Sequence, residues 1–483
     1  MDLITGTLNL STTEATVGPQ DQGGMAFTRS YIASEGYRDN LTGTLEAEET
    51  CQEGGGCIFT YTVSVGAYST VFGNNLIPLT RDGSTLAQSG TNWIYTAADG
   101  TVAVFDSTKL TQWPGLAQAN GGLISTLTKP NGEQWTWHYR GALITVSTPS
   151  GPTPVTFWRV QSATNNLGYQ LKAEYANNAP SGPADISAFT TRTRVWAINN
   201  AVDYCDPNAD ACGGFTQPWQ NVAIAVRGTD MTTTDAIGRV TTWQFDGYGV
   251  LQQLQSPDPA HAPIILTYKA GKISTYADGA GVWSYDFQDV VPGGGQEPIY
   301  RNTTVTDPNN LATLVRSNIR TNRLLRLTLP GSRTTVLDWD QYNRLASVTD
   351  PEGGVTTYTR DIRNNITEVR RVAKPGSSLA DIVQTAAYPA NCSATTLRIC
   401  NQPLTVTDAR GFVTDYTYDA SGNLLTVTGP APTSGAPRPQ TRYVWEQRYA
   451  WYKQNGSNEI TQAASPVWVL VSQSECLTGA TCQ

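Results

Sequence analysis

Short runs of alternating apolar and polar residues, separated by turn residues, recur along this chain of 483 residues. In residues 413–418, the side chains of Thr414, Tyr416 and Tyr418 alternate onto one face of an extended strand. No segment shows sustained helical periodicity. Short strands at regular spacing, with turn signals between them, predict an all-β protein.

One pattern of turn and strand residues occurs three times. It begins with an aspartate, which is followed by a glycine three residues later, a Val-Thr pair and an aromatic residue, and a second aspartate closes it. The opening pairs are Asp235 and Gly238, Asp350 and Gly353, and Asp408 and Gly411. The closing aspartates are Asp246, Asp361 and Asp419, with Gly249, Asn364 and Gly422 three residues on. Self-similarity of this kind indicates a repeat architecture.

Aspartate followed three residues later by glycine or asparagine is typical of tight turns. The carboxylate bonds a nearby backbone N–H, and glycine or asparagine tolerates the positive φ that closes the turn. Each unit is therefore predicted to be strand, turn, strand, turn. Leu424 and Val427 are three residues apart, so a flat strand cannot place both on one face. Either both faces are covered or the strand bends there.

The combination of Asp-x-x-Gly, Tyr416-Thr-Tyr418-Asp419 and Gly422-Asn423-Leu424 resembles the RHS or YD repeat. This repeat occurs in bacterial Rhs and wall-associated proteins, toxin-complex subunits and teneurins. The resemblance is specific over residues 231–430 and patchy elsewhere. It implies a β-sheet coiled into a shell or barrel-like solenoid, which in the family encloses a C-terminal toxin or forms a rigid extracellular body. The family's self-cleavage motif, Asp-Pro followed by Gly-Leu, is missing, so the resemblance implies no autoprotease.

The domain organisation follows from where the clean repeats lie. Residues 1–110 carry a β pattern with few clean units, and terminal repeats are usually atypical. We therefore expect residues 1–110 to form an atypical N-terminal β segment, a candidate cap, and residues 111–483 to form the repeat shell. Because the sequence near its end still resembles shell, we expect the shell to be incomplete at the C-terminus.

Eight cysteines fall into four close pairs: Cys51 and Cys57, Cys205 and Cys212, Cys392 and Cys400, Cys476 and Cys482. This spacing, in a chain with only two histidines, favours four disulfide-closed loops over zinc sites. Disulfides indicate an oxidising compartment, so we expect a bacterial protein that is secreted, extracellular or at the cell surface. No apolar run reaches the 18 residues typical of a membrane span, so none is expected.

Charge excludes one class of partner. The net charge is −8, whereas a nucleic-acid-binding surface needs a basic stripe. The basic residues between Arg316 and Arg333 alternate with apolar ones, as on the polar face of strands. No nucleic-acid partner is expected.

Candidate chemistry is sparse. Asp206, Asn208 and Asp210 place oxygen ligands at alternate positions, as in a calcium loop. However, the glycine and glutamate of such a loop are missing, and a turn inside the Cys205–Cys212 loop explains the same residues. Calcium stays the weaker alternative, and no other metal or cofactor is expected.

Histidines and aromatic residues suggest no catalytic centre. His138 lies in a strand pattern and His261 in a loop, and neither lies near a nucleophile motif. Several aromatic residues in predicted strands either pack in the protein interior or stack against sugars, and packing is the commoner use. They are Trp135, Trp137, Trp243, Tyr358 and Tyr416. The repeat aspartates recur along the chain, whereas an active site is local.

The sequence therefore predicts a non-catalytic structural protein. The leading hypothesis is a secreted shell segment that encloses or presents a toxin or another partner, with a C-terminal toxin or further shell segments as partners. One alternative is an extracellular adhesin or fibre that binds cell-surface glycans. A second alternative is a polysaccharide-cleaving tail protein, which would need two carboxylates converging in one groove.

Overall fold

The computed structural model describes residues 1–32, 36–51, 57–66, 68–111, 121–148, 151–291, 298–392, 397–454, 456–457 and 459–477. Strands dominate, and the all-β prediction is confirmed. The helical elements of the described residues are short: η1 (Gln20–Gln22), η2 (Ser107–Lys109), η3 (Pro183–Asp185) and α1 (Ile186–Thr190).

The N-terminal part contains nine strands among its described residues. They are β1 (Asn9–Val17), β2 (Met25–Ile32), β3 (Gly36–Asp39), β4 (Gly43–Cys51), β5 (Cys57–Val65), β6 (Tyr68–Phe72), β7 (Thr85–Ser89), β8 (Asn92–Thr96) and β9 (Val102–Asp106). Strands β1 to β3 form a small antiparallel sheet of their own.

The strands after β9 belong to one large antiparallel sheet, apart from the β34–β35 hairpin. Its first half contains β10 (Gly121–Thr128), β11 (Gln134–Thr148), β12 (Gly151–Asn165), β13 (Tyr169–Tyr175), β14 (Arg192–Asn199), β15 (Asn221–Arg227), β16 (Asp230–Asp235), β17 (Val240–Phe245), β18 (Leu251–Gln255), β19 (Ile264–Lys269), β20 (Lys272–Asp278) and β21 (Gly281–Val290).

The second half contains the clean repeats. Its elements are β22 (Tyr300–Thr306), β23 (Ala312–Asn318), β24 (Arg323–Leu329), β25 (Arg333–Trp339), β26 (Leu345–Thr349), β27 (Val355–Arg360), β28 (Ile366–Val372), β29 (Ile382–Ala387), β30 (Thr405–Thr407), β31 (Val413–Tyr418), β32 (Leu424–Thr428), β33 (Gln440–Arg448), β34 (Trp451–Lys453), β35 (Ile460–Gln462) and β36 (Val467–Cys476).

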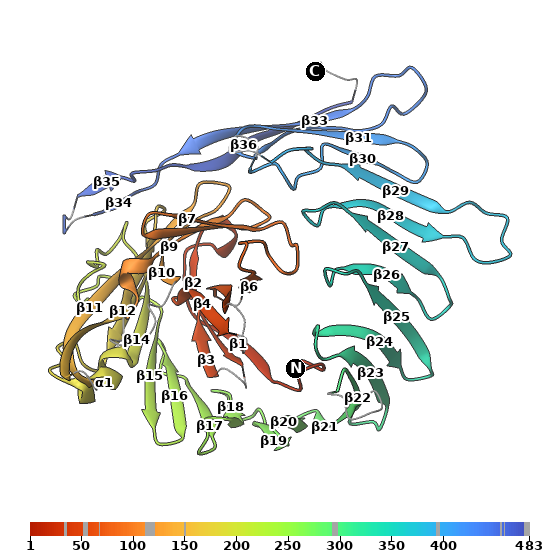
Figure 1. The fold of residues 1–483 in the computed structure, drawn as a ribbon. Helices are drawn as coiled ribbons and strands as arrows, with labels where there is room; N and C mark the ends of the chain where they lie inside the picture. Colours follow the sequence, from red (N-terminus) through yellow and green to blue (C-terminus); the bar gives the residue numbers. More distant parts are fainter. Residues whose placement is uncertain are drawn as a thin grey trace.

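Consecutive strands from β10 to β33 pair in chain order, and β33 then pairs with β36. At the other end the sheet branches, because β10 pairs with β9 and also with β4. The sheet is not closed into a cylinder. It winds instead into an arc, with the N-terminal strands inside (Figure 1). The predicted winding sheet is confirmed.

The two ends of the arc touch through backbone and side-chain hydrogen bonds rather than through a β-ladder. The Lys453 N–H donates to the Asn200 carbonyl at 3.0 Å, and the Trp468 N–H donates to the Asn131 carbonyl at 2.7 Å. The Asn166 amide donates to the Ser465 carbonyl at 3.3 Å. These contacts join the corners before β11, β13 and β15 to the segment around β34 and β36.

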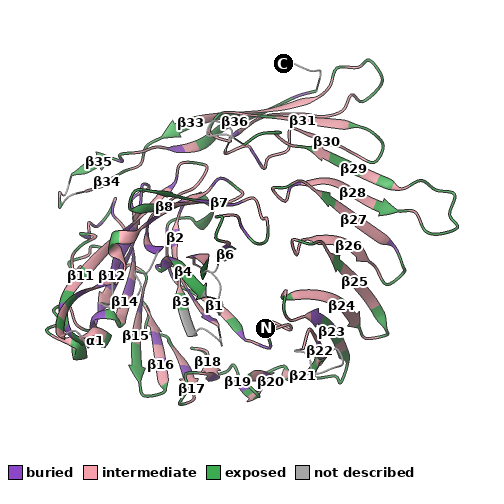
Figure 2. Cartoon of the chain, in the orientation of Figure 1, coloured by how far each residue is buried: buried purple, intermediate pink, exposed green. Residues whose placement is uncertain are grey.

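The N-terminal residues reach across the inside of the arc. Arg301 on β22 donates to the Ile4 carbonyl at 2.6 Å, and Asn401 donates to the Ala98 carbonyl at 2.8 Å. Buried side chains gather around the N-terminal strands and β11 to β14, whereas β24 to β33 are mostly half-buried (Figure 2). The division at residue 110 into a cap and a shell stays a proposal.

Candidate functional site

Eight aspartates among the described residues close corners between strands in the same way. One carboxylate oxygen accepts the backbone N–H groups of the residues two and four positions on, at 2.7 to 3.1 Å. The residue three positions on is Gly or Asn, with φ between 58° and 86°. The eight are Asp235, Asp246, Asp307, Asp340, Asp350, Asp361, Asp408 and Asp419.

Six of these aspartates are the predicted turn formers of the three sequence repeats, and Asp340 and Asp307 lie outside those three repeats. Asp307 makes the same corner, with Asn310 at a φ of 63°. The sequence signal for this corner is the Asp-x-x-Asn spacing. Pro308, directly after the aspartate, obscured that signal. These hydrogen bonds stabilise the charged form of the carboxylate even where it is little buried. The amide of Phe412, with further bonds from Arg410, lowers the pKa of Asp408.

A β-bulge follows the corner in each repeat. In β32, Leu424 lies opposite Tyr418 and Thr426 lies opposite Thr417, so Leu425 is an extra residue. The same shift leaves Gln252, Leu325, Ala346 and Thr367 as extra residues in β18, β24, β26 and β28. The bulge bends the strand, so Leu424 and Val427 share a face although they are three residues apart.

The carbonyl just before each bulge accepts a hydrogen bond from a side chain on the following strand or just beyond it. Trp339 Nε1 donates to the Leu324 carbonyl at 2.7 Å, and Trp445 Nε1 donates to the Leu424 carbonyl at 2.8 Å. Tyr268 Oη, Arg360 Nε and Tyr388 Oη donate likewise to Leu251, Leu345 and Ile366. An aromatic or arginine side chain at this position therefore links one hairpin to the next.

The apolar repeat positions form one continuous stripe, which we call the inner lane. Residues paired across two strands lie on the same face of the sheet, and so do residues two apart on one strand. Stepping from partner to partner in this way, from β17 to β33, connects a single set of side chains on one face. The lane comprises Trp243, Leu254, Leu266, Tyr276, Tyr285, Val315, Leu327, Leu337, Val348, Tyr358, Val369, Tyr416, Val427 and Tyr443.

The N-terminal segment covers the beginning of this lane. Leu8 and Tyr31 pack with Trp243 and Leu266, and all four are buried. The Leu251 N–H donates to Tyr31 Oη at 2.9 Å. Further along, nothing comparable covers the lane: Cys400 is the only buried apolar side chain among the described residues from 316 to 462.

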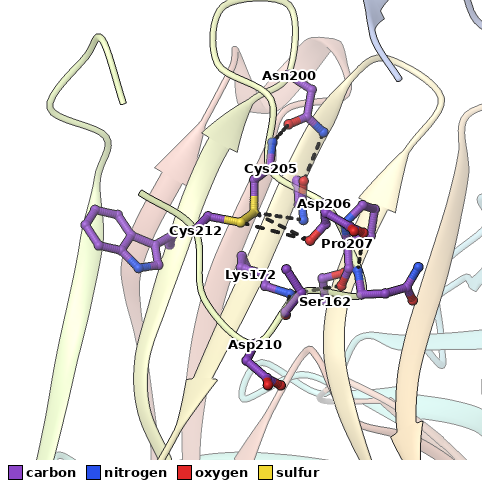
Figure 3. Close-up of a disulfide and its surroundings, with 12 residues drawn as sticks. Ser162, Lys172, Asn200, Cys205, Asp206, Pro207, Asp210 and Cys212 are labelled. Carbon is purple, nitrogen blue, oxygen red and sulfur yellow. Dashed lines mark hydrogen bonds between the residues drawn. A yellow bond between two sulfur atoms is a disulfide. The ribbon is translucent and has the colours of Figure 1, made fainter. Parts of the chain in front are cut away.

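The Cys205–Cys212 loop encloses a buried cation. The disulfide is present, and the side chain of Lys172 on β13 reaches into the loop (Figure 3). Lys172 Nζ donates to the Pro207 carbonyl at 3.0 Å and also to the Ala209 carbonyl. Burial lowers the pKa of Lys172 to about 8. A lysine ammonium thus binds the carbonyl oxygens of the loop that resembled a calcium site.

The three calcium candidates lie in this loop but point to different partners. The Asp206 carboxylate accepts the Asn208 N–H at 2.9 Å. Asp210 pairs with Arg140 and lies 3.5 Å from Arg159. Calcium binding by Asp206, Asn208 and Asp210 stays a prediction.

The second disulfide that the structure describes joins Cys392 and Cys400. In each of the predicted pairs Cys51–Cys57 and Cys476–Cys482, one side chain lies outside the described residues, that of Cys51 or of Cys482. Residues 51 and 57 face each other in the β4–β5 ladder.

The two histidines have different surroundings. His138 is half-buried beside the Lys172 loop, and its Nε2 lies 3.0 Å from Thr164 Oγ1. His261 forms an exposed pair with Asp258. In the described part of the chain, no group of three or more His, Cys, Asp or Glu side chains is placed to hold a metal ion. No helix there is long and apolar enough to cross a membrane.

Comparison with known proteins agrees with this repeat geometry. The RHS Repeat family matches residues 320–355, 339–374 and 401–434, which contain β24 to β28 and β30 to β32. None of the curated proteins matches the chain.

Solved structures of Tc toxin proteins are similar over most of this chain. The complex of TcdB2–TccC3 with Cdc42 is 12% identical over 93% of the chain, with a TM-score of 0.37. The Tc holotoxin pore of Photorhabdus luminescens is 14% identical over 94%, with a TM-score of 0.35. The chain covers 25% of each of these two proteins, about a quarter of their length. Three matches to one repeat family fall on strands that share one continuous register, so residues 320–374 and 401–434 contain RHS repeats.

Proposed function

We propose that this chain is a non-catalytic segment of a secreted shell, and that it encloses or presents a polypeptide such as a toxin. The observation that carries the proposal is the uncovered second half of the inner lane. Tyr358, Val369, Tyr416 and Val427 are half-buried, whereas the equivalent Trp243 is 2% exposed beneath the N-terminal segment. An apolar stripe left open on the concave side of a sheet favours contact with another chain.

The covered half of the lane indicates what kind of partner fits. There, the chain before β1 supplies Leu8 and strand β2 supplies Tyr31 to the lane. The Gly6 carbonyl accepts the Ile273 N–H at 3.0 Å, and Tyr31 Oη accepts the Leu251 N–H at 2.9 Å. An extended polypeptide with apolar side chains at intervals fits the open half in the same manner. Glycan binding has no such support from the lane, because its aromatic rings lie among aliphatic side chains.

The test uses the full chain and an unfolded polypeptide, reduced carboxymethylated lactalbumin, as the probe. Tyr358→Asp places a charge on the lane and is expected to weaken binding of the probe at least tenfold. Thr359→Asp is the matched control, because Thr359 is the next residue of β27 and is exposed on the opposite face. Equal binding by both variants, or no binding by the unaltered chain, would count against the proposal.

A further inference from the structure

A cleft of about 670 Å³ opens beside the N-terminal strands, away from the inner lane. Trp135 and Trp137 on β11, Tyr95 on β8 and Leu127 on β10 form its floor. Asp99 and Lys129 lie on its rim. Its volume is within the range of small-molecule sites, and its lining has the usual apolar floor with a few polar groups.

The two indole rings are held in place by the protein. Their centroids are 5.9 Å apart with 34° between the planes. Trp135 Nε1 donates to Glu133 Oε1 at 2.6 Å, and Trp137 Nε1 donates to the Leu41 carbonyl at 2.9 Å. Because both N–H groups are engaged, a ligand meets ring carbon, mainly that of the half-buried Trp135, since Trp137 is 6% exposed. Such a surface suits a ring whose own face carries C–H groups.

The rim supplies both an acceptor and a donor of hydrogen bonds. The exposed Asp99 carboxylate accepts the Thr101 N–H at 2.8 Å and Thr101 Oγ1 at 3.0 Å, which leaves further lone pairs for a ligand. The Lys129 side chain is 42% exposed and pairs with Glu133 at 2.9 Å. Because Glu133 neutralises Lys129, the Asp99 carboxylate disfavours an anion, and the acceptor and the donor together suit a molecule with several hydroxyl groups.

We propose that this cleft binds one or two residues of a neutral carbohydrate. The pyranose ring lies against Trp135, and its hydroxyl groups bond Asp99 and Lys129. This binding goes beyond the scaffold role, because it requires neither the inner lane nor an enclosed partner.

The experiment is saturation-transfer NMR on the full chain, with glucose, galactose, mannose, N-acetylglucosamine and their disaccharides as probes. We expect saturable binding of at least one sugar. Trp135→Ala is expected to weaken that binding tenfold or more. Trp451→Ala, which removes an indole that is 58% exposed on β34, is expected to leave it unchanged.

A second variant separates loss of binding from loss of fold, since Trp135 also packs on the core. Ser69→Trp places a large side chain on the exposed rim and should abolish binding without lowering the thermal midpoint. Absence of saturable binding to every sugar would overturn the proposal. So would binding that survives both cleft variants.

Discussion

A single carboxylate oxygen fixes each corner of the repeat, because it accepts two backbone N–H groups that no strand partner can reach. The same residue type in the same spacing therefore gives the same corner at Asp235 and at Asp419. The surroundings of His138 are not local in this way, because they come from strands that are distant in sequence. Its desolvation, with Lys172 nearby, lowers its pKa from 6.5 to about 4.

We expect this histidine to make the protein less stable in mild acid. The unfolded chain binds a proton at this histidine near pH 6.5, but the folded chain does not until about pH 4. Stability is therefore fully present above pH 6.5 and falls as the pH drops toward 4. Between pH 7 and pH 5 the loss is about 2 kcal/mol. Urea unfolding of His138→Gln at both pH values should show a smaller difference than the unaltered chain.

The chain has only one other histidine, which makes a clean control. His261 has a side chain that is 75% exposed, so His261→Gln should leave the difference between pH 7 and pH 5 intact. If His138→Gln showed the full difference, burial of this ring would not be its cause.

At the scale of elements, the bulge and its hydrogen-bond donor belong together. The bulge brings two apolar residues onto the lane, and a tryptophan, tyrosine or arginine from the following hairpin segment binds the carbonyl before it. These donors are different residues from the repeat aromatics Trp243, Tyr358 and Tyr416, which lie on the lane. The sequence predicted the packing of the repeat aromatics but not these bonds, since the acceptor is a backbone group on another strand.

Trp339→Phe keeps a ring but removes the N–H that bonds the Leu324 carbonyl. We expect the free energy of unfolding to fall by about 1 to 3 kcal/mol, because that half-buried carbonyl loses its side-chain donor. Urea denaturation measures the loss. Trp451→Phe, at an exposed indole, should change stability by less than about 0.5 kcal/mol. Similar values for the two variants would show that the bond contributes nothing.

At the scale of the molecule, the N-terminal segment and the sheet stabilise each other. Tyr31 is 1% exposed and lies between the small N-terminal sheet and the first clean repeat. The ion pair between Asp39 on β3 and Arg192 on β14 also joins the two sheets. Arg29 on β2 pairs with Glu14 within the small sheet at 3.2 Å and donates to Met231 Sδ on β16 at 3.1 Å. The arc therefore has a dense first half and an open second half.

Tyr31→Ala should lower stability by about 3 to 5 kcal/mol, the cost of removing a large buried aromatic side chain. It should also uncover Trp243 and Leu266, so binding of the dye ANS should rise. Tyr248→Ala, at a side chain that is 95% exposed, serves as the control and should change neither value. An unchanged ANS signal in Tyr31→Ala would mean that the segment does not hold the lane closed.

The sequence by itself determined the strands, the corners and the presence of RHS repeats. Strand and turn preferences act within a repeat unit, so residues 413–418 form the predicted strand and Asp408 forms the predicted corner. The disulfide between Cys205 and Cys212 is equally local. No long-range information was needed for any of these features.

Only the tertiary structure decided which faces are covered. The Leu251 N–H meets Tyr31 Oη across 220 residues of sequence, and Lys172 fills a loop that begins more than 30 residues later. Such contacts depend on how far the sheet curls and where it branches. Those quantities are sums over many small twists and bulges, and no single repeat unit encodes them.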